Sequence, residues 1–396
     1  MFYFDIPVLF PSSVLWPIRT TIVLFRREFS FSSSLVKCLT AHPVEQMNDP
    51  ENTYAPIPSE GSLEQRWRIW IDMETRRRVF AACFLLDVHS MRYLEQPPTK
   101  VRGMDYTVHE TLMIPFTYTT SAMWDAQRAR EWGGQANSAR AVRTLASISL
   151  LNITRDNVAL TSIFDGAVLL AALSLKLPRR RSLTTLDLLR SPTDMDPFFL
   201  RIASLFPGSG TAYAYMALQH TPLHILLSVS GDSWVFNNKV PSAECFAGHV
   251  QKLGEWRVSS SGAVATAFAA RALKAFVTRC ISLDNAGREA IIRPSWADIT
   301  DFWGFYVCIL ICWACGGFGV IEPPPFNLSA ALQTVDNIAQ LSPDAIHQMV
   351  QVHHTRQIIG LGRRLLMKDC LGGRSILMAD AVNVLIKLDG GRGEEW

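Results

Sequence analysis

Three cysteines in one apolar stretch have the spacing that most directly suggests chemistry. Cys308, Cys312 and Cys315 are spaced C-x3-C-x2-C, a pattern whose thiolates bind an iron–sulfur cluster in radical enzymes that use S-adenosylmethionine. Here the three cysteines lie late in the chain, at positions i, i+4 and i+7 of an apolar helical pattern, and no alternation of strands and helices follows. We therefore interpret them as thiols packed in a core, and keep a radical enzyme as a remote alternative.

Zinc sites need cysteine and histidine ligands at fixed spacing, and the sequence does not contain that spacing. The only C-x-x-C pair is Cys312 with Cys315, and no histidine pair follows it at zinc-finger spacing. Pro222 lies between His220 and His224, and no glutamate stands beside His220, so both histidines are expected to have core or turn roles. We expect no metal ligand in this chain.

Hydrolytic and nucleotide-binding motifs are also incomplete. Gly208-Ser209-Gly210 and Gly231-Asp232-Ser233-Trp234 lack the G-x-S-x-G spacing after a strand. The glycine-rich segments at 316–319 and 360–362 lack the strand, turn and helix that surround a phosphate-binding loop. We nominate no catalytic residue and expect no cofactor, so the chain is not predicted to be an enzyme.

The charge balance argues against a module that binds nucleic acid by itself. The 396 residues include 38 basic and 35 acidic side chains, for a net charge of +3, whereas phosphate-binding modules are strongly basic. The hydrophobic fraction of 48% supplies a large core. Eight cysteines are scattered along the chain, several within apolar runs, which is typical of reduced thiols in an intracellular protein.

The elements that must position these residues are predicted to be helices. Apolar residues recur with helical periodicity, strand signals are sparse, and proline and glycine turns separate the segments. The sequence therefore predicts an all-α fold, a large bundle-like helical domain over residues 61–390 that follows an irregular leader and linker over residues 1–60. The expected helices cover residues 63–93, 119–132, 136–151, 155–176, 196–206, 211–229, 242–258, 260–281, 296–316, 328–340, 343–369 and 374–388.

The first of these helices carries charged residues inside an apolar pattern. Large apolar groups fall on both of its faces, which is typical of a helix buried in a larger helical assembly. Glu74 stands three and four residues before Arg77 and Arg78, the favourable orientation for side-chain pairs along a helix. Burial would require such pairing, so we interpret this set of charges as architecture rather than as a catalytic site.

The order of residues in this helix resembles the signature of the fungal-specific transcription factor domain, the helical regulatory region of fungal zinc-finger and zinc-cluster activators. Residues 121–132, SAMWDAQRAREW, are similar to the family's segment with a tryptophan after the proline turn, and residues 220–240 are similar to a later segment of regulators with two-cysteine two-histidine fingers. The resemblance covers residues 61–390. The motif residues are Trp70, Glu74, Arg77, Arg78, Phe84, Asp87, Pro97, Pro98, Trp124 and Trp234.

This resemblance implies regulation of transcription in the nucleus, with a secondary-metabolite or pigment pathway as the suggested target. Zinc and direct DNA binding belong to a family module that these 396 residues do not contain, so the chain is expected to be a fragment, an incomplete gene product, or a regulator that pairs with a full-length partner. The implied partners are the transcription machinery, a full-length regulator or a second copy in a dimer, and a small effector.

An integral membrane protein is the main competing interpretation. Residues 302–321 carry no charge and match the roughly 20 residues needed to span a bilayer. Four glycines, acidic flanks at Asp301 and Glu322, and the lack of a nearby basic cluster favour a buried central helix instead. We therefore expect no membrane association.

The leader is apolar, but its prolines and its lack of a positive amino-terminal region argue against a working signal peptide. Pro7, Pro11 and Pro17 interrupt any continuous apolar helix. We expect residues 1 to about 60 to be removable without loss of the fold. Limited proteolysis should trim this stretch first, and a remaining fragment that unfolds once trimmed would contradict the assignment.

Overall fold

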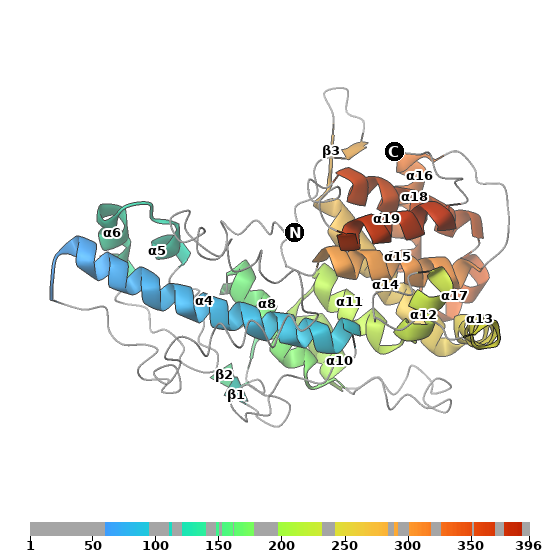
Figure 1. Cartoon of the computed structure of the whole chain (residues 1–396), viewed down its shortest axis with the longest axis horizontal. Coiled ribbons are helices and arrows are strands. Elements are labelled where there is room, and N and C mark those ends of the chain that lie inside the picture. The colour runs from blue at the N-terminus through green and yellow to red at the C-terminus, as the bar shows by residue number, and fades with distance from the viewer. Residues whose placement is uncertain are drawn as a thin grey trace. The chain divides into compact units, whose positions relative to one another are not determined.

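A computed structural model describes residues 60–94, 111–112, 121–139, 148–149, 153–160, 162–177, 197–231, 242–283, 289–291, 301–317, 326–350, 352–368 and 376–389. Helices make up most of this part of the chain (Figure 1), which confirms the all-α prediction. The residues group into two compact units. The first unit contains the described residues up to Met91 and those from 111 to Lys176, and the second contains Arg92 to Leu94 and the described residues from Leu177 onward. The expected single domain over 61–390 stays a prediction.

The first unit is organised around one long helix. α4 begins with a capping box, in which the Ser62 hydroxyl accepts from the Gln65 backbone N–H at 3.2 Å and the Gln65 side chain accepts from the Ser62 N–H at 2.9 Å. Shorter helices and one small antiparallel sheet accompany it. The elements are α4 (Leu63–Leu94), β1 (Thr111–Leu112), α5 (Ser121–Asp125), α6 (Ala129–Ala139), β2 (Ile148–Ser149), α7 (Arg155–Leu160) and α8 (Ile163–Ser174).

Burial in this unit follows the sequence pattern. Trp70, Phe84 and Leu85 of α4 are buried, and their spacing places them along one side of the helix. In α8, Val168 to Ser174 are all buried. These two helices therefore supply much of the described core of this unit.

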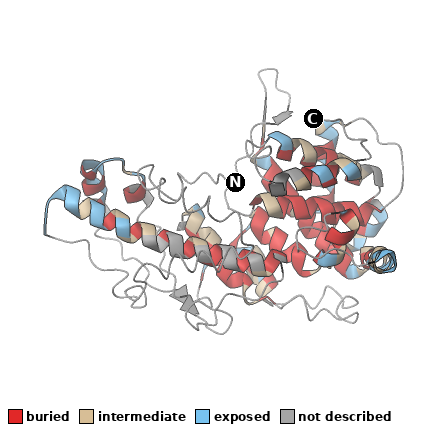
Figure 2. Cartoon of the chain, viewed as in Figure 1, coloured by how far each residue is buried: buried red, intermediate tan, exposed pale blue. Residues whose placement is uncertain are grey.

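The second unit is a packed set of helices around α14 and α15. α14 contacts α11, α15 and α16, and α15 also contacts α18. Most residues of both central helices are buried (Figure 2). The elements are α10 (Pro197–Leu205), α11 (Gly210–Gln219), α12 (Leu223–Ser230), α13 (Ala243–Arg257), α14 (Ser260–Thr278), β3 (Ile281–Leu283), β4 (Glu289–Ile291), α15 (Asp301–Gly316), α16 (Leu328–Gln340), α17 (Pro343–Met349), α18 (Val352–Lys368) and α19 (Ile376–Leu388).

Glycines allow α18 to approach α15 closely. A Cβ atom on Gly362 of α18 would overlap the side chain of Ile309 in α15, and one on Gly316 at the end of α15 would overlap Thr355 of α18. Side chains at these positions would force the two helices apart. The glycine-rich segment 360–362, which lacks a phosphate-binding context in the sequence, is therefore a helix-packing element.

Several expected helices differ from the observed ones at their ends. Residues 211–229 form two helices because Pro222 cannot donate a backbone N–H and disfavours helical geometry in the residue before it. The expected helix over 343–369 is divided into α17 and α18. The expected helices over 119–132 and 136–151 do not match the observed elements, because α6 runs from Ala129 to Ala139 across the boundary between them and Ile148–Ser149 form β2. The expected helix over 328–340 matches α16.

The apolar run at 302–321 forms a shorter helix than the membrane alternative requires. α15 ends at Gly316, and Gly317 has a φ of 93°, a backbone conformation that favours glycine. Among the residues that the structure describes, none of the helices combines the length and the apolar character needed to cross a bilayer.

Candidate functional site

A buried ion pair lies in the middle of α4. The Nε atom of Arg78 donates to the Oε1 atom of Glu74 at 2.8 Å, and each side chain is only 4% exposed. The expected pairing of Glu74 with an arginine one turn later is thus confirmed for Arg78. The same helix carries a second pair of the same spacing, Arg68 with Glu64 at 3.0 Å, but these side chains are 76% and 50% exposed.

Three tryptophans pack together beside this ion pair. The guanidinium carbon of Arg78 lies 4.3 Å from the ring centroid of Trp124 in α5, within the range of a cation–π interaction. Trp70 of α4 is 6.5 Å from Trp124 and 6.0 Å from Trp132 of α6, measured between ring centroids. All three tryptophans are buried. We call Trp70, Glu74, Arg78, Trp124 and Trp132 the charge–tryptophan cluster.

The charge–tryptophan cluster is built to hold helices together. Its carboxylate and its guanidinium neutralise each other, and aromatic rings flank the guanidinium, which compensates in part for the loss of water around both charges. The cluster contains neither a nucleophile nor a solvent-exposed base. The cluster therefore has a structural role, which is to hold α4 against α5 and α6.

The motif residues nominated from the sequence meet only in part. Trp70, Glu74, Arg78 and Trp124 come together in the cluster, and Phe84 is buried farther along α4. The side chains of Arg77 and Asp87, and the whole of Pro97, Pro98 and Trp234, lie outside the described residues.

Trp132 was missed as a cluster member, although it ends the segment 121–132 that supports the family resemblance. Its ring is fully buried against Trp70. The signal that could have identified Trp132 from the sequence is a large aromatic residue at the end of a motif segment.

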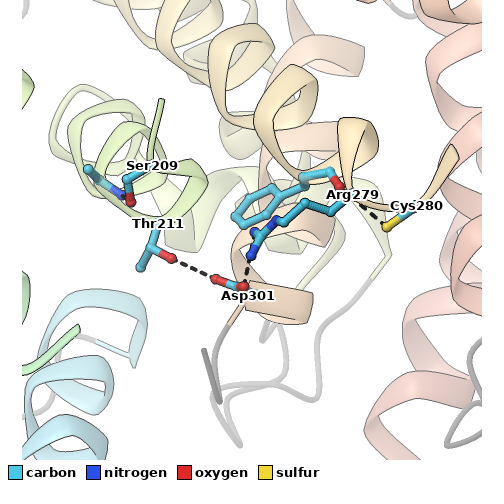
Figure 3. A network of polar contacts seen from close by, with 7 residues as sticks. Ser209, Thr211, Arg279, Cys280 and Asp301 are labelled. Atoms are coloured by element: carbon cyan, nitrogen blue, oxygen red, sulfur yellow. Dashed lines mark hydrogen bonds and ion pairs between the residues drawn. The ribbon is translucent and has the colours of Figure 1, made fainter. Parts of the chain in front are cut away.

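A second buried carboxylate joins three helices of the second unit (Figure 3). Asp301, at the start of α15, accepts at Oδ1 from the Thr211 hydroxyl of α11 at 2.6 Å. Its Oδ2 accepts from Arg279, the residue after α14, at 3.1 Å. Asp301 is 1% exposed and Arg279 is 35% exposed. We call Thr211, Arg279 and Asp301 the Asp301 clamp.

The surroundings of the Asp301 clamp reinforce a structural role. The Arg279 guanidinium carbon lies 5.7 Å from the Phe276 ring centroid, and the Cys280 thiol donates to the Phe276 carbonyl at 3.3 Å. The Ser209 hydroxyl caps α11 by accepting from the Ala212 N–H. A negative charge in the first turn of α15 also interacts favourably with the positive end of the helix dipole.

The three cysteines with iron–sulfur spacing lie inside α15 and are buried. Burial raises the pKa of Cys308, and it raises the pKa of Cys312 with smaller contributions from the two neighbouring thiols. Burial also raises the pKa of Cys315, against smaller opposing effects of a hydrogen bond with Thr266 and of the charge of Arg257. Metal ligation requires thiolates, so these shifts favour the interpretation as packed neutral thiols.

Among the described residues, no three or more histidine, cysteine, aspartate or glutamate side chains are arranged to hold a metal ion. His220 follows α11 as its C-terminal cap, and its carbonyl accepts from the Trp256 indole at 2.7 Å. Its ring centroid lies 5.3 Å from that of Phe199. The expected core or turn role is thus the one observed for this histidine.

His220 should make the second unit sensitive to mild acid. Burial lowers its pKa from 6.5 to about 4, so below pH 6.5 the unfolded chain takes up a proton that the folded chain does not. Stability is then lost as the pH falls from 6.5 toward 4, by about 1 to 2 kcal/mol between pH 7 and pH 5. Urea denaturation at a series of pH values measures this loss.

The pH dependence should be smaller in His220→Gln, which cannot take up the proton. His347→Gln, at an exposed position, is the matched control and should keep the wild-type profile. A wild-type slope that persists in His220→Gln would assign the acid sensitivity to other residues.

Comparisons of the chain with protein-family models, with curated proteins and with solved structures found no match. A functional proposal therefore rests on the residues and contacts of the two units. The charge–tryptophan cluster and the Asp301 clamp both fix helices, and neither exposes a reactive group.

Proposed function

We propose that this chain is the regulatory domain of a transcription regulator resembling the fungal-specific type, acting in the nucleus through contacts with other proteins. The observation that carries the proposal is the charge–tryptophan cluster. Trp70, Glu74, Arg78 and Trp124 belong to two separate segments of the sequence motif, and they pack together in one buried site. A motif whose residues form one packed unit is maintained by architecture, as expected for a regulatory domain.

The proposal assigns no catalysis and no cofactor to the chain. Two of its buried carboxylates, Glu74 and Asp301, are used in ion pairs inside the units, as expected of a scaffold that presents surfaces to partners. The partners proposed are the transcription machinery, a full-length regulator or a second copy, and a small effector. A secondary-metabolite or pigment pathway is the proposed target.

A tethering experiment tests this role. The full chain is fused to a heterologous DNA-binding module that has no regulatory activity of its own, and expression of a reporter gene with the matching site is measured in a fungal host. We expect the fusion to change reporter expression severalfold relative to the module alone. The proposal would be contradicted by a fusion protein that is full-length and nuclear but leaves reporter expression unchanged.

Two matched variants connect the reporter to the charge–tryptophan cluster. Glu74→Gln should lose the regulatory effect because it unbalances a buried pair, whereas Glu64→Gln alters an exposed pair of the same spacing on the same helix and should keep it. Immunoblots of both fusions separate loss of protein from loss of activity. Equal reporter output from the two variants would show that the regulatory effect does not depend on the charge–tryptophan cluster.

The purified chain should bind no zinc in stoichiometric amount and should associate with DNA only weakly. The sequence lacks finger or binuclear-cluster spacing, and its net charge of +3 neutralises few phosphates. Elemental analysis measures the zinc, and a salt titration of fluorescent duplex DNA measures the affinity. One tightly held zinc per chain, or DNA binding that persists at high salt, would show that the chain carries its own DNA-binding module.

A further inference from the structure

A thiol, an imidazole and a hydroxyl meet where α12 and α13 pack together. The Oγ atom of Ser228 lies 2.8 Å from Nδ1 of His249, and the Sγ atom of Cys245 lies 3.8 Å from Nε2 of the same ring. His224 of α12 completes the group, with its ring edge-on to His249 at a centroid distance of 5.6 Å. The group is separate from the Asp301 clamp and from the cysteines of α15.

The spacing of these residues along α12 and α13 produces this arrangement. Cys245 and His249 are one turn apart on α13, and His224 and Ser228 are one turn apart on α12, so each pair lies on one side of its helix. The Ser242 hydroxyl caps α13 by accepting from the Cys245 N–H at 3.1 Å, which fixes the backbone that carries the thiol.

Access to solvent distinguishes this thiol from the others that the structure describes. Cys245 is only partly buried, whereas Cys280, Cys308, Cys312 and Cys315 are buried. His249 is also partly buried, while Ser228 is buried beneath it. A small molecule can therefore approach the sulfur of Cys245 while Ser228 holds the imidazole in place.

We propose that Cys245 is a reactive thiol that adds to soft carbon electrophiles of the α,β-unsaturated carbonyl class, with His249 as its proton acceptor and Ser228 as the residue that positions the imidazole. The inference does not depend on the proposed role in transcription. It assigns to the surface between α12 and α13 a site of covalent modification.

The proton and the electrons balance without a further reactant. With Nδ1–H donating to the Ser228 hydroxyl, the lone pair on Nε2 takes the proton from the Cys245 thiol. The sulfur forms a bond to the β-carbon of the electrophile, and the electrons of its carbon–carbon double bond move to the α-carbon as an enolate. The imidazolium then returns the proton to that carbon, so nothing is oxidised or reduced.

The surroundings keep the imidazole ready for this role. Desolvation lowers the pKa of His249, and the charges of His224 and Lys252 lower it further. The ring is therefore neutral at pH 7, with a lone pair free to accept a proton. The charged groups that face it come from both helices, since His224 belongs to α12 and Lys252 to α13.

Addition fits this site better than the two other common fates of an accessible thiol. A metal site would need further ligands, and the described residues offer no group of three around Cys245. Oxidation by a peroxide is commonly completed by a second, resolving thiol, whereas the other described thiols of this unit are buried in or beside α14 and α15. An adduct with a carbon electrophile is complete at one sulfur.

The test measures alkylation of the folded full-length chain by N-ethylmaleimide, an activated electrophile of this class. Samples are quenched at short times and each cysteine is quantified by peptide mass spectrometry. At pH 7, Cys245 should react faster in the folded chain than in the same chain unfolded in urea. His249→Gln should slow the folded reaction about tenfold or more, and Ser228→Ala should slow it less.

Controls separate proton transfer from mere exposure. His347→Gln, at an exposed histidine elsewhere in the second unit, should leave the rate unchanged, and the urea-unfolded rates should be equal in all variants. Circular dichroism checks that the variants fold.

Two results would overturn the proposal. One is an equal Cys245 rate in wild type and in folded His249→Gln. The other is a wild-type rate that is no faster in the folded chain than in the urea-unfolded chain. If His249→Gln fails to fold, the ratio of the folded to the unfolded rate at Cys245 in the unaltered chain decides.

Discussion

Glu74→Gln is expected to destabilise the first unit by about 3 to 5 kcal/mol, the usual cost of removing one partner from a buried ion pair. The amide keeps the size and shape of the carboxylate but loses its charge. Arg78 then remains as a positive charge that is 4% exposed, with the face of Trp124 still beside it. A cation–π contact contributes only about 0.5 to 2 kcal/mol, so it cannot replace the lost carboxylate.

The chain provides a matched control on the same helix. Glu64→Gln removes the same charge from a pair of the same spacing, but that pair is exposed, so the expected loss is about 0.3 to 0.5 kcal/mol. Denaturation by guanidinium, followed by circular dichroism, measures both losses. A loss below about 1 kcal/mol for Glu74→Gln would mean that this carboxylate is solvated in the folded chain.

A double variant separates buried charge from shape. Glu74→Leu with Arg78→Met removes both charges and keeps the site filled, and such replacements are often close to neutral. We expect it to be more stable than Glu74→Gln. If the double variant is instead the less stable of the two, the contacts of Arg78 with Trp124 contribute more than the charge balance.

The sequence predicted the helices well where the pattern is local. The expected helices over 63–93 and 328–340 match α4 and α16, because their apolar patterns and end signals depend on residues within a few positions of one another. The pairing of Glu74 with Arg78 is local in the same sense. The separation of α11 from α12 was missed, since one helix was expected over 211–229, although Pro222 marks the break.

Contacts between distant segments could not be predicted in this way. Asp301 and Thr211 are 90 positions apart, and in the sequence Asp301 was noticed only as a charge beside an apolar run. Cys245 and His249 have a visible one-turn spacing, but Ser228, which positions the imidazole, comes from another helix. Such sites depend on how helices pack, and periodicity in one segment does not specify its neighbour.

Asp301→Asn is expected to destabilise the second unit by about 2 to 3 kcal/mol, less than a fully buried pair would lose, because Arg279 is 35% exposed and water can solvate it. The amide can still accept from Thr211, but it removes the charge at the start of α15 and presents N–H groups where Arg279 also donates.

Asp336→Asn is the matched control, since Asp336 pairs with Lys274 at 2.9 Å across an exposed surface. Its expected loss of stability is about 1 kcal/mol or less. Amide hydrogen exchange in α15 measures the loss within this unit, and added salt distinguishes the two pairs because it screens exposed charges far more than buried ones. Equal losses for the two variants, removed alike by salt, would show that the Asp301 clamp is a surface pair that does not join α11, α14 and α15.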